Sequence, residues 1–424
     1  MIADYLRKLR LFGRDLRLYL VSWALVQFAV SGILVVLLNL YLLRLGYGPE
    51  FVGLLNAAAA LVFSVSCLPA GALGRRWGSR RPMIAGLGLF VVGIGLLPLA
   101  EFIPKTWQAG WLLASSILAY GGYALYVVNG SPFLMGSTTS AERDHAFSAQ
   151  AALGALCGFA GSLVGGMLPG LFAATLGLSL DQPAPYRYPL WVATGSYVLA
   201  LLALLPTREV RARQPQKREV ETGPAPYGLI ALLALVYLLC VAGWGAVQAF
   251  FNVYLDAGLG VSTPLIGALS AAGQLLSVPA ALSAPLLMAR WGKVRVFTLG
   301  SFGVALSLLP LAFIPRWGAA GLGFMGMTAL FWMADPAFMV YHQEIVAPGW
   351  RPTASGAVMM AVGLSYSAMA LGGGYLIAAL GYPSLFLTGA GVTAVGALLF
   401  WAYFRVPRGE LARGPAPAQM DAAR

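Results

Sequence analysis

The chain has 424 residues, of which 59% are hydrophobic and 10% charged, so it carries too little charge for a soluble domain, where roughly 25% of residues are charged. The net charge of +12 lies in short clusters and not in a continuous basic domain, which argues against a nucleic-acid binder. With 3 scattered cysteines and 2 histidines, we expect neither a disulfide framework nor a metal site.

Twelve apolar segments follow one another along the chain, and a membrane span takes about 20 mainly apolar residues. We predict spans at residues 18–45, 50–73, 82–103, 107–139, 144–176, 187–206, 226–256, 262–288, 294–314, 317–342, 352–380 and 382–404. They form two six-helix halves, 18–206 and 226–406, joined by a charged linker at 207–225. A basic cytoplasmic arm at 1–17 precedes them, and a polar tail at 407–424, expected to be disordered, follows. The predicted fold class is an all-α integral membrane protein.

Lysine and arginine sort to one side of these twelve spans. Of the 27 basic residues, 23 fall in the termini and in the loops on their side, while Arg44, Lys105, Arg187 and Arg316 fall on the other side. Basic residues accumulate in cytoplasmic loops. We therefore predict that both termini are cytoplasmic, in a membrane of the bacterial inner (plasma) membrane type.

The two halves repeat each other in the same orientation. An Arg/Trp/Gly-containing loop at residues 73–82 has a counterpart about 214 residues later, and its flanks match as well. The matching segments are 73–82 with 289–295, 39–41 with 252–254, and 96–100 with 308–312. Parallel repeats of this kind are typical of transporters with a central substrate site.

The first of these loops resembles a motif of the major facilitator superfamily. Residues 71–81 (GALGRRWGSRR) are similar to that family's pattern Gly-x-Leu-x-Asp-Arg-x-Gly-Arg-Arg/Lys, and residues 286–295 hold a second copy. The resemblance covers essentially the whole chain and implies a gating role for the motif residues Gly71, Arg75, Arg76, Gly78, Arg80, Arg81, Arg290 and Gly292. Arg75 stands where the family has an Asp that helps to lock its halves, which puts the usual inner-gate network in doubt. Topology and lipid headgroup contact are an equal alternative for the arginines.

Span five is rich in glycine. Residues 154–166 (GALCGFAGSLVGG) resemble the glycine motif of the family's exporters, although Ser162 follows Gly161 where that motif has Pro. Small residues at four-residue spacing let helices approach closely. The pattern favours export, and tight packing alone is the alternative.

Polar and aromatic side chains inside spans are costly in lipid unless they face a cavity or a partner. They recur at helical spacing in spans one, four, seven and ten, and span eight adds an amide. Helices 1, 4, 7 and 10 line the central cavity in the family that the motif resembles. The resemblance implies a substrate cavity lined by Trp23, Gln27, Ser31, Tyr123, Tyr126, Asn129, Trp244, Gln248, Asn252, Gln274, Trp332, Asp335 and Met339. For any single Tyr or Trp, interfacial anchoring is an equal alternative.

Asp335 is the one acidic residue well inside a predicted span. A carboxylate in a cavity of low dielectric constant can carry a proton during transport, so Asp335 is the candidate for proton coupling. The alternative is a structural ion pair with Arg290 or Arg351.

Enzyme signatures and nucleotide-binding motifs are absent from the sequence, which favours a secondary transporter without cofactors. Aromatic residues and methionines adapt to varied apolar shapes, so we expect export of hydrophobic or amphipathic small molecules. The alternatives are uptake of a neutral solute such as a sugar, transport of a lysophospholipid, and a transport-inactive receptor. The expected partners are the lipid bilayer, a small-molecule substrate and protons, and the expected state is a monomer.

The charge distribution makes a topology prediction. Reporter fusions after residue 215 and at the C-terminus should both report the cytoplasm, because 23 of 27 basic residues lie on that side. A periplasmic signal at either point would contradict the twelve-span topology.

Overall fold

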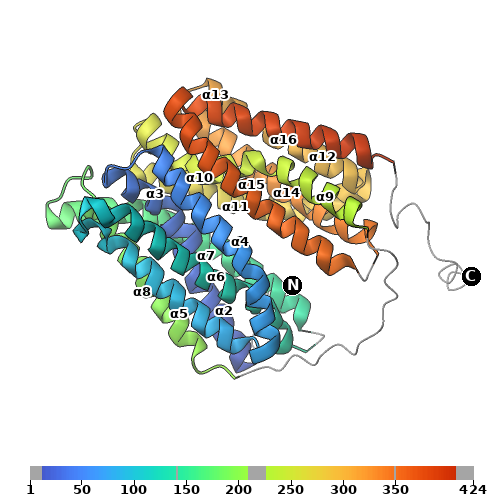
Figure 1. The fold of residues 1–424 in the computed structure, drawn as a ribbon, viewed down its shortest axis with the longest axis horizontal. Helices are drawn as coiled ribbons and strands as arrows, with labels where there is room; N and C mark the ends of the chain where they lie inside the picture. The colour runs from blue at the N-terminus through green and yellow to red at the C-terminus, as the bar shows by residue number, and fades with distance from the viewer. Residues whose placement is uncertain (1–11, 140–141, 209–225, 348–349, 407–424) are drawn as a thin grey trace, which may run out of the picture. The chain divides into compact units, whose positions relative to one another are not determined.

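The computed structural model describes residues 12–139, 142–208, 226–347 and 350–406, and every element in these ranges is helical (Figure 1). The predicted tail at 407–424, and most of the predicted arm and linker, lie outside the described residues. The elements are α2 (Arg14–Gln27), η1 (Phe28–Leu34), α3 (Val35–Arg44), α4 (Pro49–Trp77), α5 (Arg80–Leu96), η2 (Leu97–Phe102), α6 (Lys105–Gly136), α7 (Arg143–Leu176), α8 (Ala184–Leu204), α9 (Tyr227–Cys240), α10 (Ala242–Val253), η3 (Tyr254–Gly258), α11 (Thr263–Trp291), α12 (Lys293–Ser307), α13 (Leu309–Phe313), α14 (Trp317–Ile345), α15 (Arg351–Leu380) and α16 (Tyr382–Phe404).

These elements make twelve helical spans, which confirms the predicted all-α membrane fold. The first span runs without interruption from Arg14 to Arg44 through α2, the π-helical η1 and α3. Eleven of the spans in the described residues are long and apolar enough to cross a membrane. The twelfth, α8, is not among them, and it carries Arg187 in its first turns and polar residues in its middle.

The chain divides into two compact units. Unit 1 comprises Met1–Gln214, Phe250–Leu275 and Ala370–Ala379, and unit 2 comprises Pro215–Ala249, Leu276–Met369 and Leu380–Arg424. Unit 1 therefore holds the first sequence half together with parts of α10, α11 and α15 and the whole of η3.

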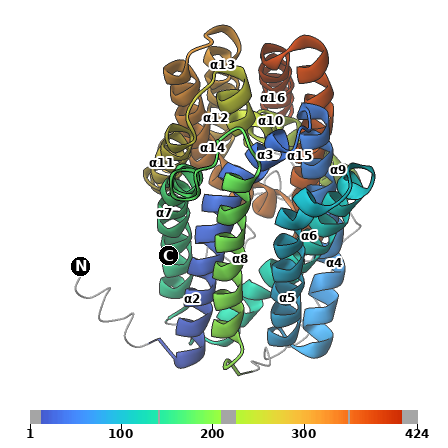
Figure 2. The same ribbon diagram turned by 90° about the vertical axis from the view of Figure 1, so that its left-hand side faces the viewer.

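Unit 1 depends on close helix contacts. The α2 helix packs against α7 and α8, and η1 packs against α7 (Figure 2). At the contact of η1 with α7, a Cβ atom on Gly32 would lie 2.4 Å from the backbone of Gly161. Farther along α7, a Cβ atom on Gly166 would lie 2.9 Å from the Cα atom of Gly267 in α11. Glycines thus bring three helices of unit 1 into backbone contact.

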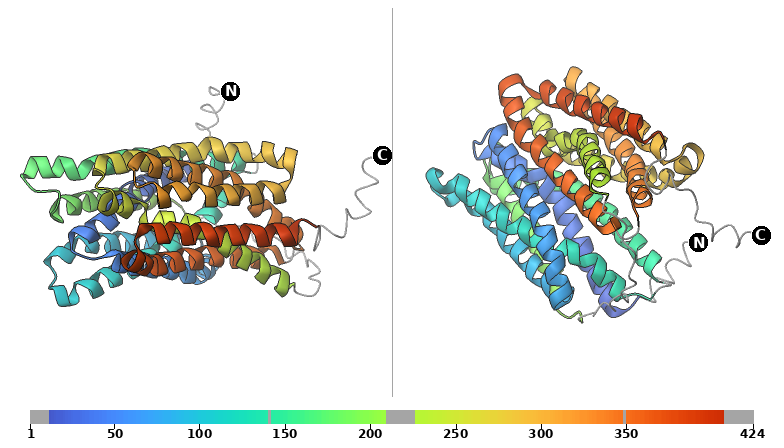
Figure 3. Two further views of the ribbon diagram at one scale, coloured as in Figure 1. Left: turned by 90° about the horizontal axis from the view of Figure 1, so that it is seen from above. Right: turned by 45° about the vertical axis from the view of Figure 1, so that its right-hand side comes forward.

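Unit 2 has an aromatic core. Its helices α9, α12, α14 and α16 run side by side (Figures 1 and 3). Tyr237 stacks on Phe338 with ring centroids 4.2 Å apart, and Phe297 packs edge-on against Phe400 at 4.8 Å. All four side chains are buried. Stacked and edge-on pairs of this kind add about 0.5–1.5 kcal/mol each beyond their buried area.

The sequence repeat recurs in the backbone. Helix α4 ends at Trp77 and α11 ends at Trp291, and each is followed by a glycine in the left-handed region, Gly78 with φ +83° and Gly292 with φ +79°. Only glycine adopts this conformation without a steric penalty. The next helix of each repeat, α5 or α12, is followed by a short helix with proline at its second position. The two motif loops therefore share one backbone conformation.

The contact of η1 with α7 generates a stability prediction. A Cβ atom on Gly161 would lie 2.0 Å from the carbonyl oxygen of Phe28, and backbone cannot yield as a flexible side chain does. Gly161→Ala should therefore destabilise the protein by about 1–3 kcal/mol and lower its unfolding temperature in detergent.

Gly170, in the same helix, is the matched control, because a Cβ atom there meets nothing within 4 Å. Gly170→Ala should be neutral or slightly stabilising, since alanine favours a helix. Equal unfolding temperatures for the two variants would contradict the close contact.

Candidate functional site

The candidate cavity residues fall into two groups, one in each unit. Unit 1 holds Trp23, Gln27, Ser31, Tyr123, Tyr126, Asn129, Asn252 and Gln274, and unit 2 holds Trp244, Gln248, Trp332, Asp335 and Met339.

In unit 1, the first span presents Trp23, Gln27 and Ser31 towards α7. The indole nitrogen of Trp23 donates to the carbonyl oxygen of Gln150 at 3.0 Å, and its ring stacks on Tyr126. Gln27 donates to the hydroxyl of Ser31, while its carbonyl oxygen Oε1 is buried and has no hydrogen-bond partner among the described residues. Gln27 therefore offers an unused acceptor.

The other two amides of this region join helices. Gln274 on α11 donates to the carbonyl oxygen of Ser31 at 3.0 Å and to the hydroxyl of Ser162 at 2.7 Å. Asn252 on α10 donates to the carbonyl oxygen of Val35 at 2.8 Å and accepts from Ser270. Both amides are occupied by contacts between the helices of unit 1.

The span-four residues lie in the interior of unit 1. Tyr126 is fully buried and shares a hydrogen bond with Ser22, and Tyr123 packs against Phe90 with ring centroids 5.0 Å apart. Asn129 is buried and donates to the carbonyl oxygen of Ala70 on α4. A Cβ atom on Gly74 would lie 1.8 Å from Oδ1 of Asn129, so the amide fits there because Gly74 has no side chain. Asn129 thus supports the helix that carries the first loop motif.

The motif arginines differ in their surroundings. Arg75, Arg76, Arg81 and Arg290 are exposed. Arg80 donates to Thr207 and to the carbonyl oxygen of Leu205, at the C-terminal end of α8, where a positive charge is favourable. In the second copy, Lys293 forms an ion pair with Glu344 at the end of α14. Both loops thus fasten the start of one helix to the end of another.

In unit 2, three rings form an aromatic cluster, defined as Trp244, Phe331 and Tyr366. Trp244 stacks on Phe331 with ring centroids 5.3 Å apart and lies 6.1 Å from Tyr366. The indole Nε1 of Trp244 is buried without a hydrogen-bond partner among the described residues. Gln248, one turn along the same helix, is half-buried.

The other candidates of α14 have different exposures. Trp332 is 41% exposed and packs edge-on against Phe331, whereas Met339 is half-buried against the aromatic core.

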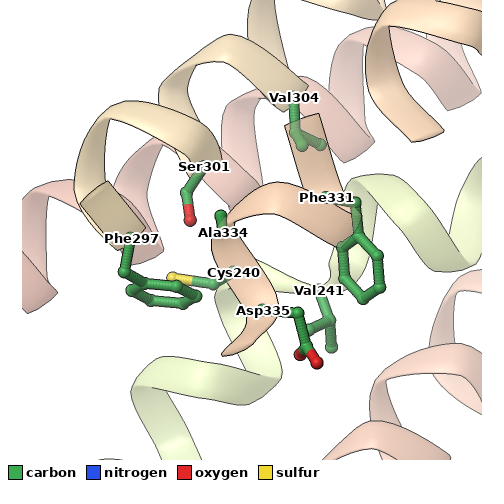
Figure 4. Close-up of a pocket in the computed structure, with 8 residues that line it drawn as sticks. All are labelled: Cys240, Val241, Phe297, Ser301, Val304, Phe331, Ala334 and Asp335. Carbon is green, nitrogen blue, oxygen red and sulfur yellow. The ribbon is translucent and has the colours of Figure 1, made fainter. Parts of the chain in front are cut away.

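Asp335 lies beside the aromatic cluster. The phenol of Tyr237, whose ring stacks on Phe338, donates a hydrogen bond to Oδ1 of Asp335. Asp335 and Phe331 are one turn apart on α14 and line the same small cavity, together with Cys240 and Val241 (Figure 4). The cavity measures about 10 Å³, which is about the space of one water molecule.

The ion pairs among the described residues do not include Asp335. Arg290 and Arg351, the two structural partners considered for it, are both exposed. In the parts of the chain that the structure describes, no group of three or more His, Cys, Asp or Glu side chains could hold a metal ion.

An ion pair that the sequence analysis did not anticipate lies in unit 1. Arg44, at the end of α3, binds both carboxylate oxygens of Asp256 in η3, at 2.6 and 2.8 Å. Its guanidinium also donates to the carbonyl oxygen of Leu180 and lies 5.2 Å from the ring centre of Tyr186. In the sequence, Arg44 is one of the four basic residues that fall on the side opposite the other 23. This exception is the sequence feature that could have pointed to a special role for Arg44. The pair joins the first and seventh spans.

This pair generates an asymmetric prediction. The Asp256 side chain is 8% exposed and that of Arg44 is 20% exposed. Arg44→Gln should therefore cost about 3 kcal/mol or more, because it leaves a buried carboxylate unpaired. Asp256→Asn should cost less, since the more exposed guanidinium remains hydrated.

The exposed Arg316 is the control, and Arg316→Gln should change the unfolding free energy by about 0.5 kcal/mol or less. The exchange Arg44→Asp with Asp256→Arg should recover part of the loss measured by thermal unfolding. Additive losses in the exchanged variant would contradict a direct pair.

Comparison with known proteins agrees with this architecture. The family model described as Major Facilitator Superfamily matches residues 20–370 and again residues 233–419. Among solved structures, a mutant of the nucleoside transporter NupG matches with a TM-score of 0.75 at 14% identity, over 92% of this chain and 100% of its own.

The xylose transporter XylE from E. coli, in an inward open conformation, matches with a TM-score of 0.70 at 14% identity, over 97% of this chain and 100% of its own. A POT family transporter in complex with 5-aminolevulinic acid matches with a TM-score of 0.69 at 14% identity, over 92% of this chain and 96% of its own. These likenesses show the fold, and no curated protein matches the chain by sequence. Because the family model spans most of the chain, the protein belongs to the major facilitator superfamily, as a multi-pass secondary transporter of small molecules and not an enzyme.

Proposed function

We propose that the protein exports hydrophobic or amphipathic small molecules by alternating access and couples this export to protons. The observation that carries the proposal is the position of Asp335, a carboxylate inside a span, next to the aromatic cluster and outside the ion pairs of the described residues. An aromatic surface suits apolar substrates of varied shape, and a carboxylate can take up and release a proton.

The hydrogen bonds of the amides support an apolar substrate over a sugar. Recognition of several hydroxyl groups needs several unoccupied amides or carboxylates. Asn129, Asn252 and Gln274 are instead bonded between helices. The remaining amide candidates for the cavity are Gln27, through its Oε1 atom, and Gln248. Two amides are too few to recognise the several hydroxyl groups of a sugar.

The direction of transport is proposed from the resemblance of residues 154–166 to the exporters' motif. Its glycines at 161 and 166 lie against the backbones of η1 and α11, so the helices touch without interlocking side chains. Such contacts allow helices to slide during alternating access. The Arg44–Asp256 pair would have to break whenever the first and seventh spans separate.

Orientation belongs to the same proposal. We place both termini in the cytoplasm, with residues 18–206 and 226–406 as the two moving halves. Under this orientation Arg44 and Asp256 lie near the outer face, and the exposed motif arginines lie near the inner face, where they act in gating.

Transport assays in proteoliposomes test the proposal. With an imposed proton gradient, the protein should move a neutral amphipathic dye and should not move D-xylose or lysophosphatidylcholine. Asp335→Asn should abolish gradient-driven accumulation, because the amide cannot titrate, yet dye exchange without a gradient should persist.

The melting temperature of the same preparations separates coupling from folding. A variant that melts normally and still accumulates dye would contradict proton coupling at Asp335. Movement of D-xylose or lysophosphatidylcholine in place of the dye would contradict the proposed substrate class.

A further inference from the structure

We propose that unit 1 contains a binding site for the headgroup of an anionic phospholipid, in a cleft where the ends of three spans meet. The cleft measures about 410 Å³, within the range of about 300–1,000 Å³ that sites for small molecules occupy. It is lined by the start of α2 from Gly13 to Leu16, by the end of α6 at Gly136 and Ser137, and by Arg208 beyond α8. Figure 2 shows the start of α2 and the end of α8 at the same end of the unit. The proposal depends neither on the transported substrate nor on the direction of transport.

Two arginines bring positive charge to this cleft. The side chains of Arg14 and Arg208 form neither an ion pair nor a hydrogen bond with the residues that the structure describes. Arg80, by contrast, is engaged with the carbonyl oxygen of Leu205 at the end of α8. Guanidinium groups bind phosphate through charge-assisted hydrogen bonds. Two unpaired guanidinium groups at one cleft therefore favour a ligand that carries a phosphate group.

The other polar side chains of the cleft restrict the kind of phosphate. Asp15 also lines it, so two positive charges and one negative charge leave the lining with a net charge of +1. The Asp15 carboxylate repels a free phosphate ion more strongly than a phosphate diester, and it accepts hydrogen bonds from hydroxyl groups. The hydroxyl of Ser137 donates to the carbonyl oxygen of Phe133 at 2.8 Å and can still accept. This lining fits a singly charged phosphate diester with free hydroxyl groups, which is the headgroup of phosphatidylglycerol.

Exposed apolar side chains from the same three spans adjoin the cleft. Val21 follows Arg14 by two turns on the same face of α2. Met135 and Leu205 lie within three residues of the lining at the ends of α6 and α8. The exposed fractions of Val21, Met135 and Leu205 are 51%, 45% and 46%. Acyl chains would cover these side chains while the phosphate lies in the cleft, whereas a soluble phosphate would leave them uncovered.

The position of the cleft gives such a lipid a structural effect. The helices α2 and α8, which pack against each other, begin the first span and end the sixth. Basic pockets between spanning helices bind lipid headgroups. One phosphate held by Arg14 and Arg208 would join the two ends of the first sequence half. Because a ligand that binds only the folded state stabilises it, the lipid should raise the melting temperature.

Native mass spectrometry of the purified full-length protein tests the site. The probe is phosphatidylglycerol, and the comparison lipid is phosphatidylcholine with the same acyl chains, whose headgroup has neither a net charge nor a hydroxyl group. The wild type should bind one phosphatidylglycerol at least about tenfold more tightly than phosphatidylcholine, because the anionic headgroup alone gains from the positive cleft. Millimolar inorganic phosphate should not displace the bound lipid.

The double variant Arg14→Gln with Arg208→Gln should bind phosphatidylglycerol about tenfold more weakly, and each single variant about threefold more weakly. Phosphatidylcholine binding should not change. Without lipid the double variant should melt as the wild type does, because the two side chains have no partners among the described residues. Phosphatidylglycerol should raise the melting temperature of the wild type and not that of the double variant.

The matched control is Arg295→Gln with Arg351→Gln, which removes two positive charges from exposed positions of unit 2. It should change the affinity for phosphatidylglycerol by no more than about twofold. Equal losses in the two double variants would overturn the cleft as the binding site, because net charge alone would then attract the lipid.

Two results with the wild type would also overturn the proposal, and neither depends on the folding of a variant. Equal affinities for phosphatidylglycerol and phosphatidylcholine would exclude a site for an anionic headgroup. Displacement of phosphatidylglycerol by inorganic phosphate would show that a soluble phosphate, and not a lipid, is the ligand of the cleft.

Discussion

Inside a membrane, a polar side chain finds no water and must bond to the protein itself, and this constraint governs the interior of the chain. Gln274, Asn252 and Asn129 meet it by donating to backbone carbonyl oxygens of neighbouring helices. Each such bond fixes the spacing of two helices. The amides of the spans therefore act mainly as connectors in this structure.

Against this background, the exceptions stand out. Among the described residues, Oε1 of Gln27 and Nε1 of Trp244 are buried without partners, and the carboxylate of Asp335 has one hydrogen bond, from Tyr237. Lipid gives no compensation for such groups. Under the proposed function, a transported molecule or a proton would complete the bonding of these groups for part of each transport cycle.

The fold was predictable from the sequence to a large extent, because long apolar runs mark the spans and the Trp-Gly pairs at residues 77–78 and 291–292 mark the repeat. The contacts of individual side chains inside the helix bundle were harder to predict. The spacing of Asn129 with Tyr123 and Tyr126 suggested a cavity face, yet helical spacing gives a face and not its neighbour, and the neighbour of Asn129 is α4. The partner of Arg44 was hidden for a similar reason, since 212 residues separate it from Asp256.

The contacts of η1 and α7 also bear on how such a protein can diverge. A substitution at Gly32 or Gly161 must move a backbone, because a Cβ atom there would lie 2.4 Å or less from main-chain atoms of the other helix. A substitution at Phe331 or Tyr366 changes the aromatic cluster of unit 2 and leaves these backbone contacts in place. Side chains of unit 2 can therefore diverge while the glycine contacts of unit 1 are retained, so a change in the aromatic cluster does not require a new scaffold.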